Sequence, residues 1–258
     1  MLKCIPQFVE EIWGDESLGK LYGVDGKIGE VWLCSGHPER KTKLVDEKGN
    51  EVPWDYVTKI WGFERFPFLV KHIKTSQWLS VQVHPDDDVA RSAGEPWGKP
   101  EMWYFLKDGK LINGLQNGAL ERLKSGDRNW NELLSFTHVK KGQAMYIKPG
   151  TVHAIGPGME LYEFQMTSDI TYRFYDWDRG RKTHFEEALR VAQDIKAEPF
   201  DFKRLETDHF KIELFDKVKA KGKAVCLAIE SSGIPSSYIL ADGEEFFFNN
   251  TTFVMTLP

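Results

Sequence analysis

The stretch L-S-V-Q-V-H-P-D-D-D at residues 79–88 alternates apolar and polar side chains before it reaches a proline and three aspartates. Successive side chains of a β-strand point to opposite faces, so these residues separate onto two faces. The pattern is typical of a barrel wall whose second face lines a polar cavity; a half-exposed strand with a surface histidine is the alternative. The apolar face carries Val81 and Val83, and the polar face carries Ser80, Gln82 and His84.

A second strand is expected after residues 85–100, which read as a loop because they contain three prolines, two glycines and three consecutive aspartates. The segment G-K-P-E-M-W-Y-F-L follows at residues 98–106. A carboxylate beside aromatic rings is costly to bury unless it is paired or bound to a metal. For Glu101 the alternative is an edge-strand ion pair with Lys99. One face of this strand carries Lys99, Glu101, Trp103 and Phe105.

A third segment, residues 142–158, contains a Pro149-Gly150 turn that delivers His153 to the start of a strand. It resembles the second sequence motif of cupins, in which a Gly, a Pro-Gly turn and a His supply a metal ligand at a barrel mouth; its spacing departs slightly from the common pattern. The candidate ligands are Gln82, His84, Glu101 and His153. Two imidazoles, one carboxylate and one amide oxygen suit Zn²⁺ or a similar ion with an open position, and the lack of thiolates favours a catalytic site. The other histidines are predicted to be ordinary core or surface residues: His37, His72, His138, His184 and His209.

An arginine lies within the aromatic-rich segment 160–179. Thr171, Arg173 and Tyr175 alternate onto one face of a predicted strand, so we expect Arg173 to be oriented and partly desolvated. Such an arginine acts strongly on an anion. The alternative is an ion pair with one of the two aspartates in the D-W-D stretch at residues 176–178.

Helices are predicted in only two places. A small helical insertion is expected at about 116–135. The helix with the best periodicity is expected at 183–195, where Thr183 and Glu186 form a capping box. The order of elements is therefore β, a small helical insertion, β, a helix and then β, which favours a mainly β fold of the barrel or jelly-roll type.

Two turn signals join predicted strands. Residues 46–50 (D-E-K-G-N) predict a hairpin turn, and Asp108-Gly109 predicts a hairpin between strands at 101–106 and 110–115. Further strands are expected at 29–38, 68–73, 78–84, 145–148, 153–155, 160–166, 211–215, 224–229, 237–240, 245–248 and 253–256.

Composition narrows the classes of function. The chain has 258 residues, 41% of them apolar, and a net charge of -5, which is ordinary globular usage without a broad basic surface for nucleic acid. No apolar run reaches the roughly 18 residues of a membrane span, and the N-terminus has no signal-peptide pattern. The three cysteines form neither a metal motif nor a disulfide framework. We therefore expect a cytoplasmic protein with a small-molecule partner and without nucleic-acid or membrane partners.

Taken together, the motifs resemble the type I mannose-6-phosphate isomerase family, zinc-dependent enzymes of the cupin superfamily. Ordinary cupins place the Glu a few residues after a His pair, whereas here sixteen residues separate His84 from Glu101 and Gln82 replaces a His. The isomerase family shows both departures. The resemblance covers about residues 8–190 and rests on the motifs E-E-I-W-G (10–14), G-E-V-W-L (29–33), F-P-F-L-V-K (66–71), L-S-V-Q-V-H-P-D-D (79–87), G-K-P-E-M-W-Y (98–104), P-G-T-V-H-A-I (149–155) and S-D-I-T-Y-R-F-Y-D-W-D-R (168–179).

The resemblance implies a role for each matching residue. The metal ligands would be Gln82, His84, Glu101 and His153, holding one Zn²⁺ per chain, although Co²⁺, Mn²⁺ and Ni²⁺ could also fit. The catalytic candidates are Arg173, Lys71, Lys99 and the Ser-Asp pair Ser168 and Asp169. Candidate phosphate contacts are Ser80, Lys99 and Arg179.

The resemblance also implies the reaction, a metal-dependent interconversion of mannose 6-phosphate and fructose 6-phosphate through a cis-enediolate. Lys71 or Lys99 can act as the base only if burial beside the metal and Arg173 lowers its pKa. One alternative is another metal-dependent cupin enzyme, such as an Fe²⁺ oxygenase or a different sugar-phosphate isomerase; Gln82 in place of a His counts against the oxygenases. The other alternative is a non-catalytic sugar-binding cupin, which would need no such set of cations.

The family resemblance fades toward the C-terminus. We expect a metal-binding cupin catalytic domain at 1–195 and a C-terminal β-region at 196–258, either a reduced or a truncated second cupin-like domain. The chain is short for the family. A monomer or a weak homo-oligomer is expected.

Overall fold

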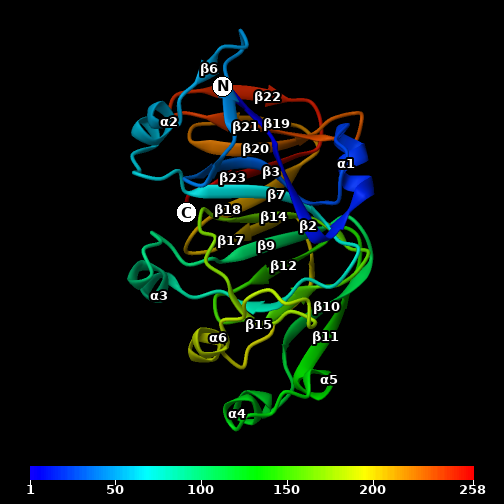
Figure 1. Cartoon of the computed structure of the whole chain (residues 1–258). Helices are drawn as coiled ribbons and strands as arrows, with labels where there is room; N and C mark the ends of the chain where they lie inside the picture. Colours follow the sequence, from blue (N-terminus) through cyan, green and yellow to red (C-terminus); the bar gives the residue numbers. More distant parts are fainter.

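Three β-sheets lie in layers in the computed structural model, which describes residues 1–258 (Figure 1). The central sheet has the strand order β16-β12-β9-β14-β7-β3-β2, with β4 paired to β3. On one side lies a five-stranded sheet of order β11-β10-β13-β8-β15, and on the other lies a sheet of order β17-β18-β23-β20-β21-β1-β5-β6. A two-stranded sheet, β19-β22, packs on the last of these.

The elements have the following bounds. The central sheet contains β2 (Gln7–Asp15), β3 (Ile28–His37), β4 (Arg40–Lys41), β7 (Phe68–Lys74), β9 (Glu101–Phe105), β12 (Gln143–Ile147), β14 (Glu160–Met166) and β16 (Phe200–Asp201). The five-stranded sheet contains β8 (Val81–Val83), β10 (Gly109–Leu115), β11 (Leu134–Val139), β13 (His153–Ile155) and β15 (Tyr172–Tyr175). The remaining strands are β1 (Leu2–Ile5), β5 (Lys43–Val45), β6 (Glu51–Val52), β17 (Arg204–Glu206), β18 (Lys211–Phe215), β19 (Val218–Lys221), β20 (Ala224–Ile229), β21 (Pro235–Leu240), β22 (Glu245–Phe248) and β23 (Thr252–Thr256). The helices are α1 (Glu16–Tyr22), α2 (Trp54–Trp61), α3 (Asp87–Ser92), α4 (Ala119–Lys124), α5 (Trp130–Leu133) and α6 (Phe185–Val191).

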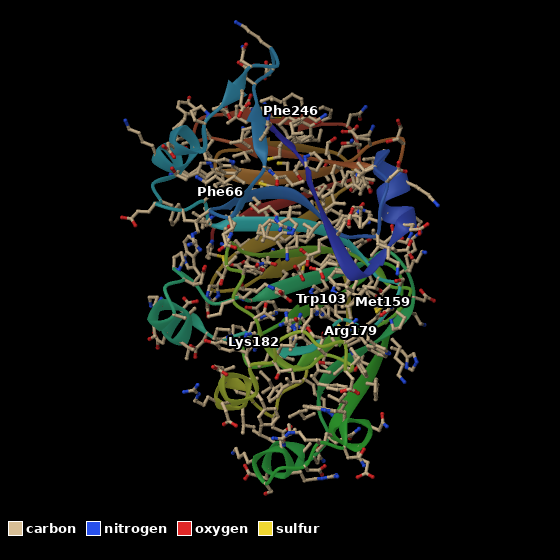
Figure 2. The ribbon with its side chains drawn as sticks, viewed as in Figure 1. Phe66, Trp103, Met159, Arg179, Lys182 and Phe246 are labelled. Atoms are coloured by element: carbon tan, nitrogen blue, oxygen red, sulfur yellow. The ribbon has the colours of Figure 1, made fainter.

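Strand β9 shows how alternation builds the two main cores. Met102 and Tyr104 face the C-terminal sheet, where the Tyr104 ring lies 4.9 Å from the ring of Phe253. Trp103 and Phe105 face the other way and belong to the core between the central and five-stranded sheets (Figure 2). The side of β9 that begins with Glu101 therefore points into the space between these two sheets.

Strand β8 confirms the alternation expected for residues 79–88. Val81 and Val83 are fully buried on the outer face of the five-stranded sheet, against a core that includes Leu123 of α4 and Ala188 of α6. Gln82 faces inward. The mainly β fold, the small helical insertion and the C-terminal β-region are likewise confirmed, as is the hairpin turn at 46–50, because β5 and β6 pair.

The predicted hairpin at Asp108-Gly109 is wrong, because β9 joins the central sheet while β10 joins the five-stranded sheet. Asp108 accepts a hydrogen bond from the backbone of Lys141 at 2.8 Å instead of forming a two-residue turn. Gly109 is needed for space: a Cβ there would lie 2.7 Å from Cγ of Met159.

The predicted helix at 183–195 is shorter, and its capping box does not form. Helix α6 spans only Phe185–Val191, with His184 at its N-cap and no side-chain cap. The backbone N–H of His184 donates to the carbonyl of Arg173 at 2.7 Å, and that of Gln193 donates to Gly150 at 2.9 Å. These two contacts with neighbouring segments fix both ends of the helix.

Two smaller differences concern the first segment. The strand at 78–84 is reduced to β8, and the loop at 85–100 contains the short helix α3. No helix is of a length and hydropathy that would cross a membrane. The division of the chain near residue 195 stays a prediction, since strands from residues 2–5 and 43–52 complete the sheet formed by residues 204–256.

Candidate metal centre and active site

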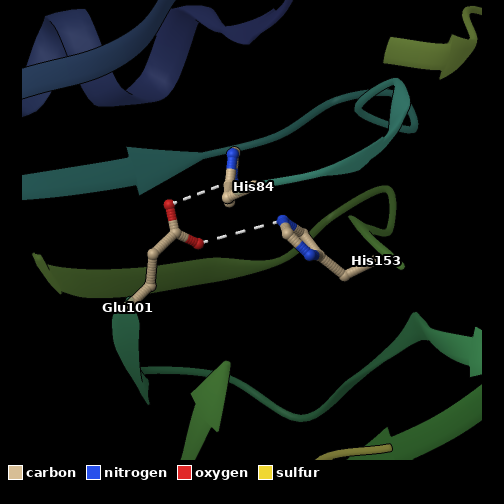
Figure 3. Close-up of side chains that lie close together, drawn as sticks. All are labelled: His84, Glu101 and His153. Atoms are coloured by element: carbon tan, nitrogen blue, oxygen red, sulfur yellow. Dashed lines mark ion pairs between the residues drawn. The ribbon is translucent and has the colours of Figure 1, made fainter. Parts of the chain in front are cut away.

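Three of the four predicted metal ligands gather between the central and five-stranded sheets (Figure 3). His84 follows β8, His153 begins β13, and Glu101 begins β9 on the facing sheet. Their ligand atoms all lie within 4.8 Å of one another, and all three residues are buried. His84 Nε2 is 3.3 Å from Oε1 of Glu101, and His153 Nε2 is 3.9 Å from Oε2.

Backbone carbonyls fix the orientation of both imidazoles. Nδ1 of His84 lies 3.0 Å from the carbonyl of Ile170, and Nδ1 of His153 lies 2.8 Å from the carbonyl of Thr151. Because a carbonyl only accepts, each Nδ1 carries the proton and each Nε2 presents a lone pair to the carboxylate. Burial lowers the pKa of both imidazoles, with His84 lowering that of His153 further, to about 3, so both are neutral at neutral pH.

The facing acceptors fit a divalent cation. Nε2 of His84 and both carboxylate oxygens of Glu101 are buried without a hydrogen-bond partner, although Oε1 forms an ion pair with Lys99. Lone pairs that face one another in a buried site need a proton or a cation between them. The two-imidazole, one-carboxylate donor set is one that Zn²⁺ prefers.

Gln82 completes the predicted set from the opposite register position to His153. Its Nε2 lies 3.5 Å from Nε2 of His153, and its Oε1 accepts from Oγ of Ser80 at 3.3 Å. A half-turn of the amide would exchange the two atoms and present the oxygen to the site. The structure therefore brings all four predicted ligands together.

The ion pair proposed as the alternative for Glu101 is also present. Nζ of Lys99 lies 3.0 Å from Oε1 of Glu101, and both side chains are buried. Burial alone would raise the pKa of Glu101, but Lys99 and then His84 outweigh it and hold the pKa well below its usual range. The carboxylate is thus ionised, as a metal ligand must be.

A cavity of about 290 Å³ opens beside these residues. Its lining is strongly charged and contains five basic and four acidic residues among 17, of which four are hydrophobic. The basic residues are Arg40, Lys71, Lys99, Arg173 and Arg181, and the acidic residues are Glu11, Glu30, Glu39 and Asp169. Ser80, Gln82, Thr171 and His37 also line it.

Arg173 is oriented at the cavity wall, and the alternative pairing with an aspartate does not form. Its Nε donates to Oγ of Ser80 at 3.1 Å and its Nη1 to the carbonyl of Lys182 at 2.9 Å. Thr171 shares the cavity, but Tyr175 does not. A register shift between Arg173 and Tyr175 places Tyr175 opposite Val81, where its ring stacks on Trp130 at 5.2 Å.

Carboxylates next to the two lysines favour the charged forms of both side chains. Burial alone would lower the pKa of Lys71, but Glu30 and Glu163, 3.4 Å and 3.3 Å from Nζ, outweigh it and raise the pKa. Burial likewise opposes the charge on Lys99, yet Glu101 raises its pKa overall. Both side chains are therefore ammonium ions.

The acidic partners of Lys71 were not predicted. Trp32 donates to Glu30 at 2.6 Å and Trp103 donates to Glu163 at 2.9 Å, so two indoles orient the carboxylates. Burial raises the pKa of Glu163 to about 7, with Glu101 raising it and Lys71 opposing the shift. The G-E-V-W-L motif contains Glu30, two residues before Trp32, which is the spacing for one strand face.

Arg179, predicted to contact phosphate, does not line the cavity, and Arg181 lines it instead. Arg179 donates to the carbonyl of Trp78 at 2.9 Å and to Asp176 at 2.7 Å. Arg181 donates twice to Asp176, at 2.9 Å and 2.7 Å, and lies 3.4 Å from Glu11. The two arginines are separated by one glycine, and only the loop geometry distinguishes them.

The Ser-Asp pair divides in the same way. Asp169 lines the cavity, whereas Ser168 is fully buried behind it and its hydroxyl has no partner. His37, expected to be an ordinary histidine, lines the cavity and is only 5% exposed. Its position at the end of β3 depends on long-range pairing, so no local signal marks it.

Comparison with known proteins relates this chain to one family. Residues 1–110 match the family model for the catalytic domain of type I phosphomannose isomerase. The mannose-6-phosphate isomerase of Streptococcus mutans is 35% identical over 206 residues, which is 73% of this chain and 65% of that protein. The probable mannose-6-phosphate isomerase GmuF of Bacillus subtilis is 36% identical over 210 residues, covering 72% and 66%. The chain thus spans just under two thirds of these relatives.

Solved structures share the fold. The mannose 6-phosphate isomerase of Bacillus subtilis superposes with a TM-score of 0.80 at 24% identity, covering 99% of each chain. The Salmonella typhimurium enzyme, solved with fructose 6-phosphate and zinc, superposes with a TM-score of 0.75 at 17% identity, covering 100% and 99%. With the sequence relatives and the shared cupin architecture, these matches show that the chain belongs to the type I phosphomannose isomerase family.

Proposed function

We propose that this chain is a zinc-dependent aldose–ketose isomerase that interconverts mannose 6-phosphate and fructose 6-phosphate. The observation that carries the proposal is the group of unprotonated donors on His84, Glu101 and His153, next to a charged cavity that Gln82 and Lys99 line. Two sequence relatives bear the name of this activity, and a structural neighbour was solved with the product sugar phosphate and zinc.

Four residues would hold the ion: Gln82, His84, Glu101 and His153. Bound zinc would supply Lewis acidity beside the cavity, and one coordination position would remain for a substrate oxygen. Co²⁺, Mn²⁺ or Ni²⁺ would suit the same donors.

The charges around the cavity match an oxyanion that develops during reaction. Moving a proton between C1 and C2 of the open sugar passes through a cis-enediolate, and fixed cations stabilise such charge without reorganising. Arg173 is held rigidly by Ser80 and the Lys182 carbonyl, and Lys99 is held by Glu101. Both guanidinium and ammonium groups therefore face the cavity as preorganised charges.

A carboxylate is our candidate for proton transfer, because neighbouring carboxylates favour the charged forms of Lys71 and Lys99. A carboxylate on the cavity wall can accept a proton from one carbon and return it to the other. Of the four acidic wall residues, Asp169 is the one that the family resemblance implies as a catalytic candidate.

The phosphate of the substrate meets several cationic and hydroxyl donors. Arg181 and Ser80 line the same cavity as Arg173, whereas Arg179 supports the loop that carries Arg181. A dianion gains most from guanidinium groups that offer planar paired donors.

The decisive experiment is a coupled assay of mannose 6-phosphate to fructose 6-phosphate on chelator-treated protein, with and without added Zn²⁺. We expect turnover only with metal, and we expect a His153→Ala variant to stay inactive. A His138→Ala variant, altered at an exposed histidine on β11, is the matched control and should behave as the unaltered protein. Folded protein that binds zinc but turns over no substrate would refute the proposal. The cytoplasmic location, the lack of nucleic-acid partners and the monomeric or weakly associating state stay predictions.

A further inference from the structure

The loop between two candidate metal ligands is closed at its neck. It runs from His84 to Glu101, and Oδ1 of Asp87 accepts the backbone N–H of Gly98 at 2.9 Å across the loop. The backbone N–H of Lys99 donates to the carbonyl of Pro85 at 3.3 Å. The neck is also sterically tight: a Cβ on Gly98 would lie 2.6 Å from the Pro85 carbonyl oxygen.

The C-terminal β-region reaches the same carboxylate. His209, in the turn between β17 and β18, places Nε2 at 3.1 Å from Oδ1 of Asp87. Because a carboxylate only accepts, the imidazole donates. One oxygen of Asp87 therefore accepts hydrogen bonds from two groups. One is Gly98, at the end of the loop between His84 and Glu101, and the other is His209, more than one hundred residues away in the turn between β17 and β18.

The turn that presents His209 is rigid. Oγ1 of Thr207 accepts the backbone N–H groups of His209 and Phe210 at 3.1 Å and 3.0 Å, and Thr207 N–H donates to the carbonyl of Phe210 at 3.0 Å. Phe210 is fully buried, and its ring lies 6.1 Å from that of Tyr146 on β12. The imidazole is thus held by its own backbone and by a core anchor.

We propose that His209 is a positioning residue for the active site, acting through Asp87 and Gly98 on Lys99. Lys99 is joined directly to Gly98, lines the cavity and lies 3.0 Å from Glu101. We call the contact from His209 through Asp87 to Gly98 the brace. The brace itself rests on geometry alone, whereas its expected effect on kcat rests on the proposed isomerase function. It gives the C-terminal β-region a part in catalysis that the family motifs do not contain.

The size of the expected effect follows from exposure. The side chains of His209 and Asp87 are 23% and 32% exposed, so their pair is screened in part and its loss relaxes the loop without unfolding it. A small displacement of a charged group that acts on the transition state lowers kcat, and we expect a loss of about 10-fold for His209→Ala. KM and zinc content should change by less than about twofold, because substrate and metal contacts remain.

The test compares His209→Ala, His209→Gln and the exposed control His138→Ala in the full zinc-loaded chain. Glutamine keeps an N–H donor and should recover most of kcat. Hydrogen exchange is measured on a peptide that contains Gly98 and Lys99, whose amides should exchange about 10-fold faster in His209→Ala only. Hydrogen exchange requires no turnover, so it tests whether His209 restrains Gly98 and Lys99 even if the unaltered protein lacks isomerase activity.

Three results would overturn the proposal. One is a kcat for His209→Ala within twofold of the unaltered protein. Another is a lowered kcat with unchanged exchange at Gly98 and Lys99, which would place the effect elsewhere. The third is equal damage from the alanine and glutamine variants, because a lost donor then could not be the cause.

Discussion

Arg173 illustrates what can and cannot be predicted at the level of one residue. Its neighbours in the sequence identify it as an oriented arginine, and the structure shows that it is held by Ser80 and by the carbonyl of Lys182. Neither partner follows from the sequence, because Ser80 is brought close by the pairing of β15 with β8, and Lys182 by the loop that follows β15.

Replacing Arg173 by alanine should lower kcat by about 10²–10³-fold, since a preorganised donor at a developing oxyanion contributes roughly that factor. Zinc content should stay the same, because no candidate ligand touches this side chain. The measurement is steady-state kinetics with metal analysis. Arg190→Ala, on α6 and bonded only to a carbonyl in its own helix, is the matched control. Near-normal turnover in Arg173→Ala would remove this residue from the catalytic step.

Single residues also show where local reasoning fails. Arg179 and Arg181 are equivalent in composition and spacing, and Asp176 accepts hydrogen bonds from both. Only Arg179 also donates to the carbonyl of Trp78, and only Arg181 lines the cavity. Lys71 shows the same limit for pKa. Its pKa depends on Glu30 and Glu163, which three different strands bring together.

At the level of elements, alternation along a strand was sufficient where one face is buried. β8 and β9 each carry side chains to the faces that their sequences predict, and both supply metal-ligand candidates. The predicted Asp108-Gly109 hairpin was wrong because β9 and β10 pair with strands of two different sheets, which the turn residues alone do not determine. The end of α6 likewise depends on the carbonyl of Gly150, which is distant in sequence.

The start of β14 contributes a measurable dependence of stability on pH. Glu160 accepts from His72 at 3.1 Å and lies 3.0 Å from Nζ of Lys74. Burial alone would raise the pKa of Glu160, but these hydrogen bonds outweigh it and lower the pKa from an ordinary 4.5 to about 2. A lowered pKa adds stability above 4.5, and that stability is lost as pH falls toward about 2.

Glu160→Gln should therefore lower the free energy of unfolding by about 1–2 kcal/mol at pH 7, after allowance for solvent screening. The difference from the unaltered chain should shrink steadily below pH 4.5, the ordinary pKa of the group. Urea unfolding at a series of pH values measures it. Glu47→Gln, at an exposed turn position, is the control and should show no such trend. A difference that persists unchanged down to pH 3 would contradict the assignment.

The whole molecule is a set of layered sheets, and the order of these sheets cannot be predicted from any local sequence pattern. A mainly β chain with a helical insertion follows from composition, turn signals and periodicity. The pairing of Leu2 with Ile239, by contrast, closes a sheet between the two ends of the chain. Such long-range contacts depend on total packing, so the sequence alone did not place β1, β5 and β6 in the C-terminal sheet.

Metal binding should stabilise the whole molecule, because the candidate ligands come from both the central and the five-stranded sheet, which enclose one core. At zinc concentrations of about 100 times Kd, linkage contributes about 2.7 kcal/mol, which raises Tm by about 5–10 °C. Calorimetry on chelated and zinc-loaded protein measures the shift. Mg²⁺ should give little, since it prefers oxygen ligands. An equal rise with zinc in a His153→Ala variant would show that the ion binds elsewhere.

The closed neck at Asp87 and Gly98 has a consequence for how this chain can vary. The hydrogen bonds at the neck fix the two ends of the loop, whereas the exposed residues 91–94, at the end of α3 and in the turn after it, include no candidate ligand. The number of residues between His84 and Glu101 can therefore change while the distance between the two side chains stays the same. Insertions at the tip should be neutral to metal affinity, which makes this turn a natural place to splice in new sequence.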